Sequence, residues 1–167
     1  AAGTYTENVL VNKLVSIIGA GSGTDGTVVT ATGGSGGVIQ LAASGASAAQ
    51  PVLLKDLRIQ PVGKAGISVG QFTQATGTAV SYVELDNVHV IGTNTSPCTE
   101  QERGLYVDLT SSLTHLVISN SAFNNLHYGW YIQKQVSADT STVQYVEVQN
   151  TTFNHNNAKG IYAEKLE

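Results

Sequence analysis

The chain has 167 residues, a formal net charge of −4 and only 12% charged residues. This length fits one domain with a buried core. The acidic balance argues against nucleic acid as a partner, because such binding needs basic side chains that displace counterions from phosphates. No apolar run approaches the roughly 20 residues of a membrane-spanning helix, so no membrane insertion is expected. The single cysteine, Cys98, cannot form an internal disulfide.

In chain order, the first signal is a pair of short β-branched runs, VSIIGAG and GTDGTVVTA, separated by glycines. They predict a first coil with Val15, Ile17, Val28 and Val29 as core positions. Residues 32–49, TGGSGGVIQLAASGASAA, fit either a flexible linker or an ordered coil. We favour the ordered coil because VIQL reads as a strand between two turns.

An eight-residue motif then occurs four times, starting at residues 52, 83, 116 and 146: VLLKDLRI, VELDNVHV, LVISNSAF and VEVQNTTF. Its spacings are therefore 31, 33 and 30 residues. Apolar residues fill its first, third, sixth and eighth positions, except for Ser121 and Thr151 at the sixth. The fifth position is always acidic or amide: Asp56, Asn87, Asn120, Asn150. A period near thirty, made of alternating segments, indicates a β-solenoid.

A second motif, glycine followed by an alternating strand, begins at Gly66, Gly104, Gly129 and Gly160. It follows the Asp/Asn position by 10, 17, 9 and 10 residues, and we assign the extra residues of the second copy to a loop over residues 92–103. The two motifs predict an all-β, right-handed parallel β-helix of about five to six coils. We expect one domain over residues 1–165, a vector-derived tail at 166–167, and neighbouring domains in a longer chain.

Stacked coils place equivalent residues about 4.8 Å apart, so the apolar positions should form interior columns. The predicted columns are Leu105, Trp130 and Ile161; Val69, Val107, Ile132 and Ala163; Leu85, Ile118 and Val148; Val90, Phe123 and Phe153. The Asp/Asn side chains at the turns should bond one another and the backbone.

The coil pattern resembles the pectin-lyase-like superfamily of right-handed β-helices, and GTYTENV followed by IIGAGSGTDGTVVT is similar to the opening of pectin methylesterases. That resemblance implies catalytic Asp and Gln residues in motifs that fall, by coil, at KAGI (64–67), VIGT (90–93) and LHYGWY (126–131). None of these segments has the Gln or Asp needed, so we predict no catalytic residues. No acid cluster accompanies Arg58, Arg103 or Lys134, and no histidine pair has zinc-site spacing, so no metal and no cofactor is expected.

One outward column does suit a ligand. Three tyrosines on successive coils are each followed, two residues later, by an acid or amide, which gives the predicted ligand site Tyr106, Asp108, Tyr131, Gln133, Tyr162, Glu164. Aromatic faces beside such groups suit sugar rings. Packing of aromatics between neighbouring strands would give the same column without a ligand.

The expected function is that of an extracellular or cell-surface module with a structural or adhesive role that binds polysaccharide. Two alternatives stay open: a degenerate or partial polysaccharide-active enzyme, and a segment of a phage tail spike.

Overall fold

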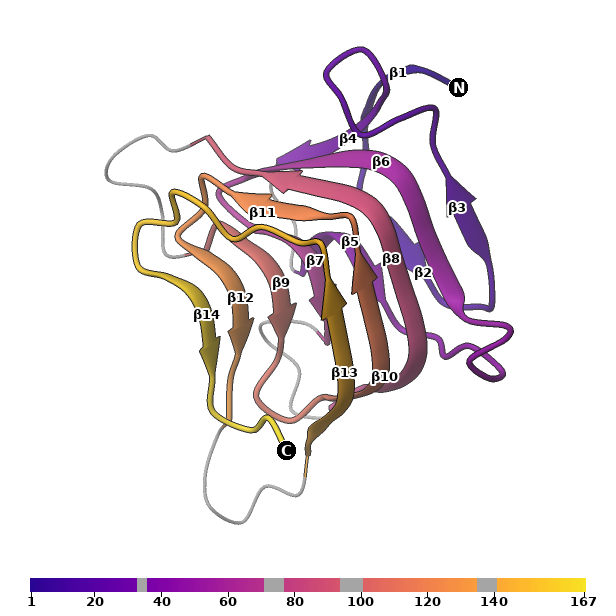
Figure 1. Cartoon of the computed structure of the whole chain (residues 1–167), viewed down its shortest axis with the longest axis vertical. Helices are drawn as coiled ribbons and strands as arrows, with labels where there is room; N and C mark the ends of the chain where they lie inside the picture. The colour runs from indigo at the N-terminus through magenta and orange to yellow at the C-terminus, as the bar shows by residue number, and fades with distance from the viewer. Residues whose placement is uncertain (33–35, 71–76, 94–100, 135–140) are drawn as a thin grey trace.

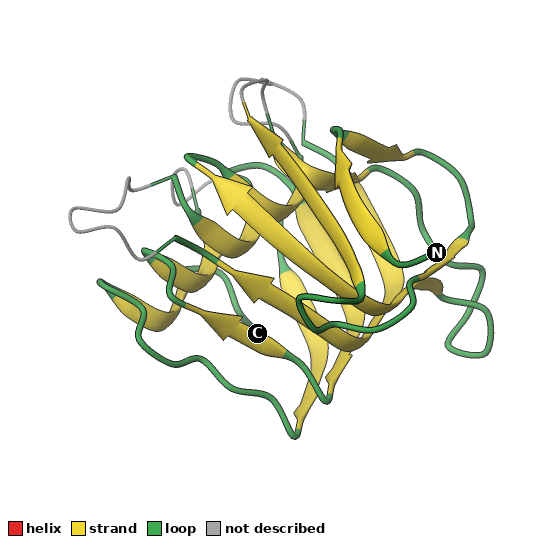
Figure 2. Cartoon of the chain, turned by 90° about the horizontal axis from the view of Figure 1, so that it is seen from above, coloured by secondary structure: helices red, strands yellow, loops and turns green. Residues whose placement is uncertain are grey.

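The computed structural model of the chain describes residues 1–32, 36–70, 77–93, 101–134 and 141–167. Those ranges form strands that pair in parallel, and none of their residues belongs to a helix that could cross a membrane. Successive strands wind around one core, so that segments about thirty residues apart lie side by side (Figures 1 and 2). The architecture is a parallel β-solenoid, as predicted.

Two sheets form its walls. The larger, sheet A, contains β1 (Gly3–Thr6), β4 (Thr27–Thr32), β6 (Val52–Val62), β8 (Ala79–Ile91), β10 (Ser112–Ser119) and β13 (Val143–Gln149), with β3 (Ser16–Ile18) on β6 and β11 (Ala122–Asn124) on β8. The smaller, sheet B, contains β2 (Val9–Val11), β5 (Gly37–Leu41), β7 (Ala65–Val69), β9 (Arg103–Val107), β12 (Tyr128–Ile132) and β14 (Lys159–Ala163). VIQL is thus a strand, and the ordered-coil interpretation of that segment is confirmed.

The solenoid has about four turns, so the predicted count of five to six was too high. The Asp/Asn turn explains the difference. It occurs four times, at Asp56, Asn87, Asn120 and Asn150, each with a positive φ of 46–53°. The described residues before Asp56 contribute the short strands β1, β3 and β4, which pair with one another or with β6, but none of these residues is an Asp or Asn with a positive φ.

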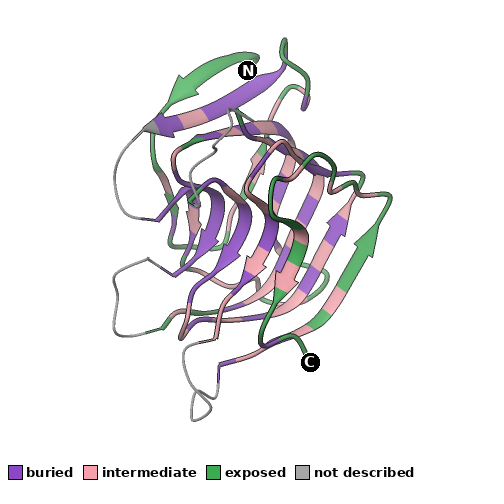
Figure 3. Cartoon of the chain, turned by 90° about the vertical axis from the view of Figure 1, so that its left-hand side faces the viewer, coloured by how far each residue is buried: buried purple, intermediate pink, exposed green. Residues whose placement is uncertain are grey.

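The interior is a set of apolar columns that follow the strand register. Leu54, Leu85 and Ile118 align on β6, β8 and β10 and are fully buried. Val28 and Val29 are buried as predicted, whereas Val15 and Ile17 only pack against the edge of the core. Burial falls in the last coil, where Val148 and Ile161 are exposed, because no further coil of the described chain covers them (Figure 3).

The last residues lie along β13. The buried Lys165 Nζ donates hydrogen bonds to the carbonyl oxygens of Asp108, Leu109 and Ser111 at 2.7, 2.9 and 2.7 Å. Leu166 bridges to Val143, and the Glu167 N–H donates to the Val143 carbonyl at 2.9 Å. The two residues expected to be a tail are therefore paired with the solenoid. Cys98 and most of the predicted 92–103 loop lie outside the described residues.

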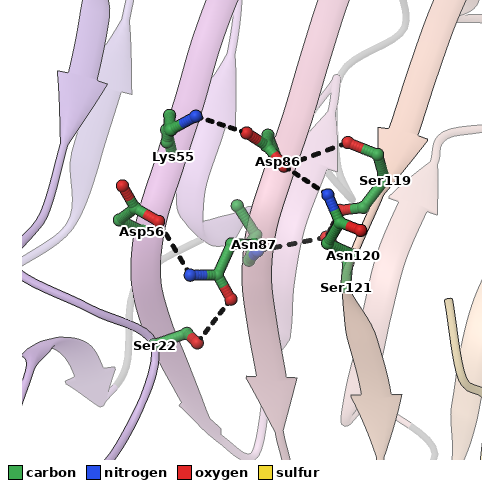
Figure 4. A network of polar contacts seen from close by, with 9 residues as sticks. Ser22, Lys55, Asp56, Asp86, Asn87, Ser119, Asn120 and Ser121 are labelled. Atoms are coloured by element: carbon green, nitrogen blue, oxygen red, sulfur yellow. Dashed lines mark hydrogen bonds and ion pairs between the residues drawn. The ribbon is translucent and has the colours of Figure 1, made fainter. Parts of the chain in front are cut away.

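The turn residues form two separate networks in place of one continuous ladder (Figure 4). Asn87 donates to Asp56 Oδ1 at 2.7 Å and accepts from Ser22 Oγ at 2.8 Å. Asn120 turns instead to Asp86 Oδ1, at 2.9 Å. The predicted hydrogen bonds between neighbouring turns are thus confirmed for Asp56–Asn87, and for Asn120–Asn150 at 3.4 Å. Asn120 does not bond Asn87, because the charged carboxylate of Asp86 is a stronger acceptor than an amide oxygen.

Asp86 is the centre of the second network. It pairs with Lys55 Nζ at 2.5 Å and also accepts from Ser119 Oγ at 3.1 Å. The hydrogen bond from Lys55, followed by that from Asn120, holds the pKa of Asp86 below its ordinary value of 3.8. The charged carboxylate is therefore the form that the folded state favours.

We predict that this network makes stability depend on pH in the acid range. Because the folded pKa of Asp86 is depressed, its contribution is complete above pH 3.8 and is lost as the pH falls through the folded value. Asp86→Asn should unfold at a slightly lower urea concentration than the parent at pH 7, since exposed ion pairs contribute little. The difference in urea midpoint between the parent and the variant should shrink below pH 3.8. A midpoint difference that stays constant from pH 7 to pH 2 would contradict this role of Asp86.

Candidate functional site

The predicted tyrosine column is present on the outer face of sheet B. The register of β9, β12 and β14 aligns Tyr106 with Tyr131 and Tyr131 with Tyr162. Their rings stack, with centroids 5.7 and 5.3 Å apart and interplanar angles of 10° and 17°. On the preceding strand β7 the same position is Ser68, so the aromatic column begins at Tyr106.

The column is less open than the sequence suggested. Tyr106 is only 2% exposed and Asp108 only 3%, so the expectation of exposed ring faces is wrong for Tyr106. The reason is that the Arg103 guanidinium carbon lies 4.4 Å from the Tyr106 ring centroid, while Tyr131 stacks beside that ring. Tyr131, Gln133 and Tyr162 are partly exposed, and Glu164 is exposed. The accessible half of the site therefore lies toward the C-terminal coil.

Hydroxyl groups and acceptors pair along this face. The Tyr106 hydroxyl lies 3.0 Å from Asp108 Oδ1 and 2.9 Å from Gln133 Oε1. Tyr162 donates to Glu164 Oε1 at 2.9 Å. Burial, and then the nearby Asp108 carboxylate, raise the pKa of Tyr106, and the hydrogen bond to Glu164 raises the pKa of Tyr162. Both phenols thus remain protonated hydrogen-bond donors at neutral pH.

Cationic side chains lie over the same rings. Arg103 is 4.5 Å from the Tyr131 centroid as well, and Lys159 Nζ is 4.5 Å from that of Tyr162. Tyr128, which aligns with Arg103 and Lys159 in the register, stacks on Tyr131 at 4.8 Å. Cation–π contacts of this kind hold the rings in place. We call Tyr106, Tyr128, Tyr131, Tyr162, Arg103 and Lys159, with Asp108, Gln133 and Glu164, the tyrosine face.

The acids of this face occupy different environments. Asp108 is buried, and its Oδ1 accepts a hydrogen bond from the Leu109 N–H at 2.7 Å in addition to lying beside the Tyr106 hydroxyl. Glu164 is at the surface and bonds Tyr162 and the Lys134 N–H, the latter at 2.8 Å. The two carboxylates therefore suit hydrogen bonding to a ligand better than they suit general acid–base catalysis, which needs both groups within reach of the reacting atoms.

The histidines of the described chain do not gather into a metal site. Burial and the charge of Arg58 lower the pKa of His89, which aligns with Arg58 in the register. Within the described ranges no three His, Cys, Asp or Glu side chains gather closely enough to hold a metal ion.

Sequence analysis missed a second aromatic column, on sheet A. Its members directly precede three copies of the eight-residue motif: Tyr82, His115, Tyr145. Their rings stack at 4.5 and 4.6 Å. Extending the motif by one residue at its N-terminal end would have shown these three aromatic residues at one repeated position. The first copy has Pro51 there.

Comparison with known proteins does not assign the chain to a family. No protein-family model matches the chain, and no curated protein and no solved structure does either. The fold and site together define a parallel β-solenoid with an aromatic outer face. The resemblance to the pectin-lyase-like superfamily remains a prediction.

Proposed function

We propose that this chain is a polysaccharide-binding β-solenoid module of an extracellular or cell-surface protein, and that the tyrosine face is its binding surface. Its role is structural or adhesive, and a pectin-lyase-like ancestry would suit it. The observation that carries the proposal is a repeated unit: a tyrosine, with an acceptor two residues later, on each of three successive coils.

The repetition is what favours a polymer. Equivalent groups recur at the coil spacing of about 4.8 Å, so the two C-terminal coils, where Tyr131 and Tyr162 are partly exposed, can present the same hydrogen-bonding groups to successive residues of an extended chain. Phenol hydroxyls, amides and carboxylates bond sugar hydroxyls, while half-exposed rings contact their apolar C–H surfaces. The rings are already clamped by Arg103 and Lys159, which lowers the entropy lost on binding.

Tyr131 is the central ring, so its removal tests the proposal. On a glycan array, we expect Tyr131→Ala to weaken binding about tenfold or more. The variant loses both the contact between the ring and the sugar and the cation–π contact that holds the ring in place, which together contribute roughly 1.5 kcal/mol. Tyr131→Phe should retain most of the binding if the ring dominates. Tyr5→Ala, at an exposed tyrosine of β1 on sheet A, is the matched control.

Binding by the parent protein that survives Tyr131→Ala would move the site elsewhere on the molecule. If a folded sample binds no glycan on the array, the tyrosine face serves packing alone and the proposed function fails.

A further inference from the structure

The outer face of sheet A carries a groove that the proposed function does not use. It encloses about 370 Å³ and runs beside the stack of Tyr82, His115 and Tyr145. The groove is also lined by Glu84, Val117 and Glu147, and by Ala48 and Pro51 of the segment before β6. The lining is mainly apolar.

The aromatic wall of the groove is held by its neighbours. The imidazole of His115 lies between the two phenol rings, at interplanar angles of 27° and 25°. All three residues have a positive φ of 54–55°, which bends sheet A at the same position on three coils. Tyr145 is 68% exposed, so one end of the stack is open to a ligand. The wall is thus formed before any ligand arrives.

A second hollow continues the groove toward the N-terminal coils. It encloses about 550 Å³, shares Pro51 and Glu84 with the first, and is also lined by Leu14 and Leu53. The strand register places one outward residue per coil along this path: Ser16, Leu53, Glu84, Val117, Glu147. Four coil spacings of about 4.8 Å give a path of roughly 19 Å along the solenoid axis. Such a path fits a linear molecule of several units.

The groove carries two carboxylates that form no ion pair with the described residues, and the charge of Lys55 acts on Glu84 without pairing with it. Glu84 and Glu147 lie on either side of Val117 in the register. Neither forms an ion pair within the described ranges, where the nearby Lys55 pairs with Asp86. Glu147 accepts a hydrogen bond from Gln149. Two carboxylates beside an apolar, aromatic surface favour a ligand that combines cationic groups with apolar faces.

A saccharide fits this surface better than a peptide. The groove lies on the face of sheet A, where the backbone N–H and C=O groups of β6, β8, β10 and β13 bond neighbouring strands. An extended peptide would therefore find few backbone partners, and burying its own amides unpaired is costly. Sugar rings can place C–H faces on Val117 and the aromatic wall while their hydroxyls stay hydrated.

We propose that this groove binds a linear amino-sugar oligosaccharide, with protonated amines at Glu84 and Glu147 and sugar rings against the Tyr82–His115–Tyr145 wall. The site is distinct from the tyrosine face and does not depend on it, because the two lie on different sheets.

Calorimetric titration with a glucosamine hexamer, at a pH where its amines are protonated, tests this directly. The N-acetylglucosamine hexamer is the matched neutral ligand and should bind about a hundredfold more weakly or not at all, because it lacks both charge contacts and each lost contact of about 1.4 kcal/mol is a factor of ten. Glu84→Gln and Glu147→Gln each remove one contact and should each weaken binding of the glucosamine hexamer about tenfold. Glu7→Gln, the same charge change at an exposed site outside the groove, should leave it unchanged.

Amide chemical shifts provide a second readout. The glucosamine hexamer should shift residues around Val117 and Tyr145, leaving those around Tyr162 unaffected. Equal affinity for the two hexamers, absence of binding, or shifts confined to sheet B would overturn the proposal. Hexalysine that binds as tightly as the glucosamine hexamer would assign the groove to cationic peptides instead. If the glycan-array test shows no binding at the tyrosine face, the titration of the sheet A groove is unaffected. The two proposals can therefore fail separately.

Discussion

Phe123→Ala is expected to destabilise the fold by about 3–5 kcal/mol, the usual cost of removing a large side chain from a packed core. Phe123 is fully buried, aligns with Val90 on β8, and stacks on Phe153 with centroids 5.3 Å apart. Its removal leaves a cavity between two coils, and the surrounding side chains relax into such a cavity only in part. Urea denaturation of the parent and the variant measures the loss.

Phe153→Ala is the matched control, because the same residue type occupies the same column one coil later. Phe153 is only partly buried, at the edge of the described stack. Its replacement should therefore cost about half as much or less, in proportion to the smaller apolar area removed from water. Equal losses for the two variants would show that the last coil is as well packed as the interior ones, contrary to its exposure.

Gly104→Ala is expected to destabilise by about 3 kcal/mol, at the upper end of what overpacking costs. A Cβ at Gly104 would lie 2.3 Å from the Gly129 carbonyl oxygen and 2.6 Å from Phe123 Cδ1. The carbonyl belongs to the adjacent strand and is fixed by the sheet, so the backbones of β9 and β12 would have to separate. Thermal unfolding should show the loss as a lower Tm.

Gly23→Ala provides the comparison. A Cβ at Gly23 meets nothing within 4 Å, so this change should stay within about 0.5 kcal/mol of the parent. The double variant Phe123→Ala, Gly104→Ala should lose less than the sum of its parts, because one of the two clashes at Gly104 is with Phe123 itself. Strict additivity would indicate that the carbonyl contact alone sets the cost.

The two outer faces of the same coil repeat carry different kinds of side chain. On sheet B the outward positions carry hydroxyl–acceptor pairs, as at Tyr162 and Glu164. On sheet A they alternate between carboxylates and Val117, beside an aromatic wall. Interior residues fix the coil, so the outward positions can vary with little cost to stability.

Much of the fold could be predicted from the sequence. The eight-residue motif marked the strands β6, β8, β10 and β13, and the glycine-led motif marked β7, β9, β12 and β14 of sheet B. The interior column of Leu105 and Trp130 and the outward column of Tyr131 and Tyr162 also followed from the period alone. These features are local: alternation assigns the face, and the coil length of about thirty residues assigns the neighbour.

Only the tertiary structure decided what each outward residue does. Tyr106 and Tyr162 occupy equivalent positions in the repeat, yet Tyr106 is buried beneath Arg103 while Tyr162 is half-exposed. Asn120 could have continued the ladder from Asn87, but bonds the carboxylate of Asp86 instead. The groove on sheet A is also lined by Ala48, which lies in a turn closed by the antiparallel bridge between Ser47 and Gln50. The sequence by itself determined the coil, because a repeat fixes strand spacing and facing. The exposure of a side chain, its hydrogen-bond partner and the shape of a groove depend on how side chains from different coils and loops pack together. The repeat period does not specify that packing.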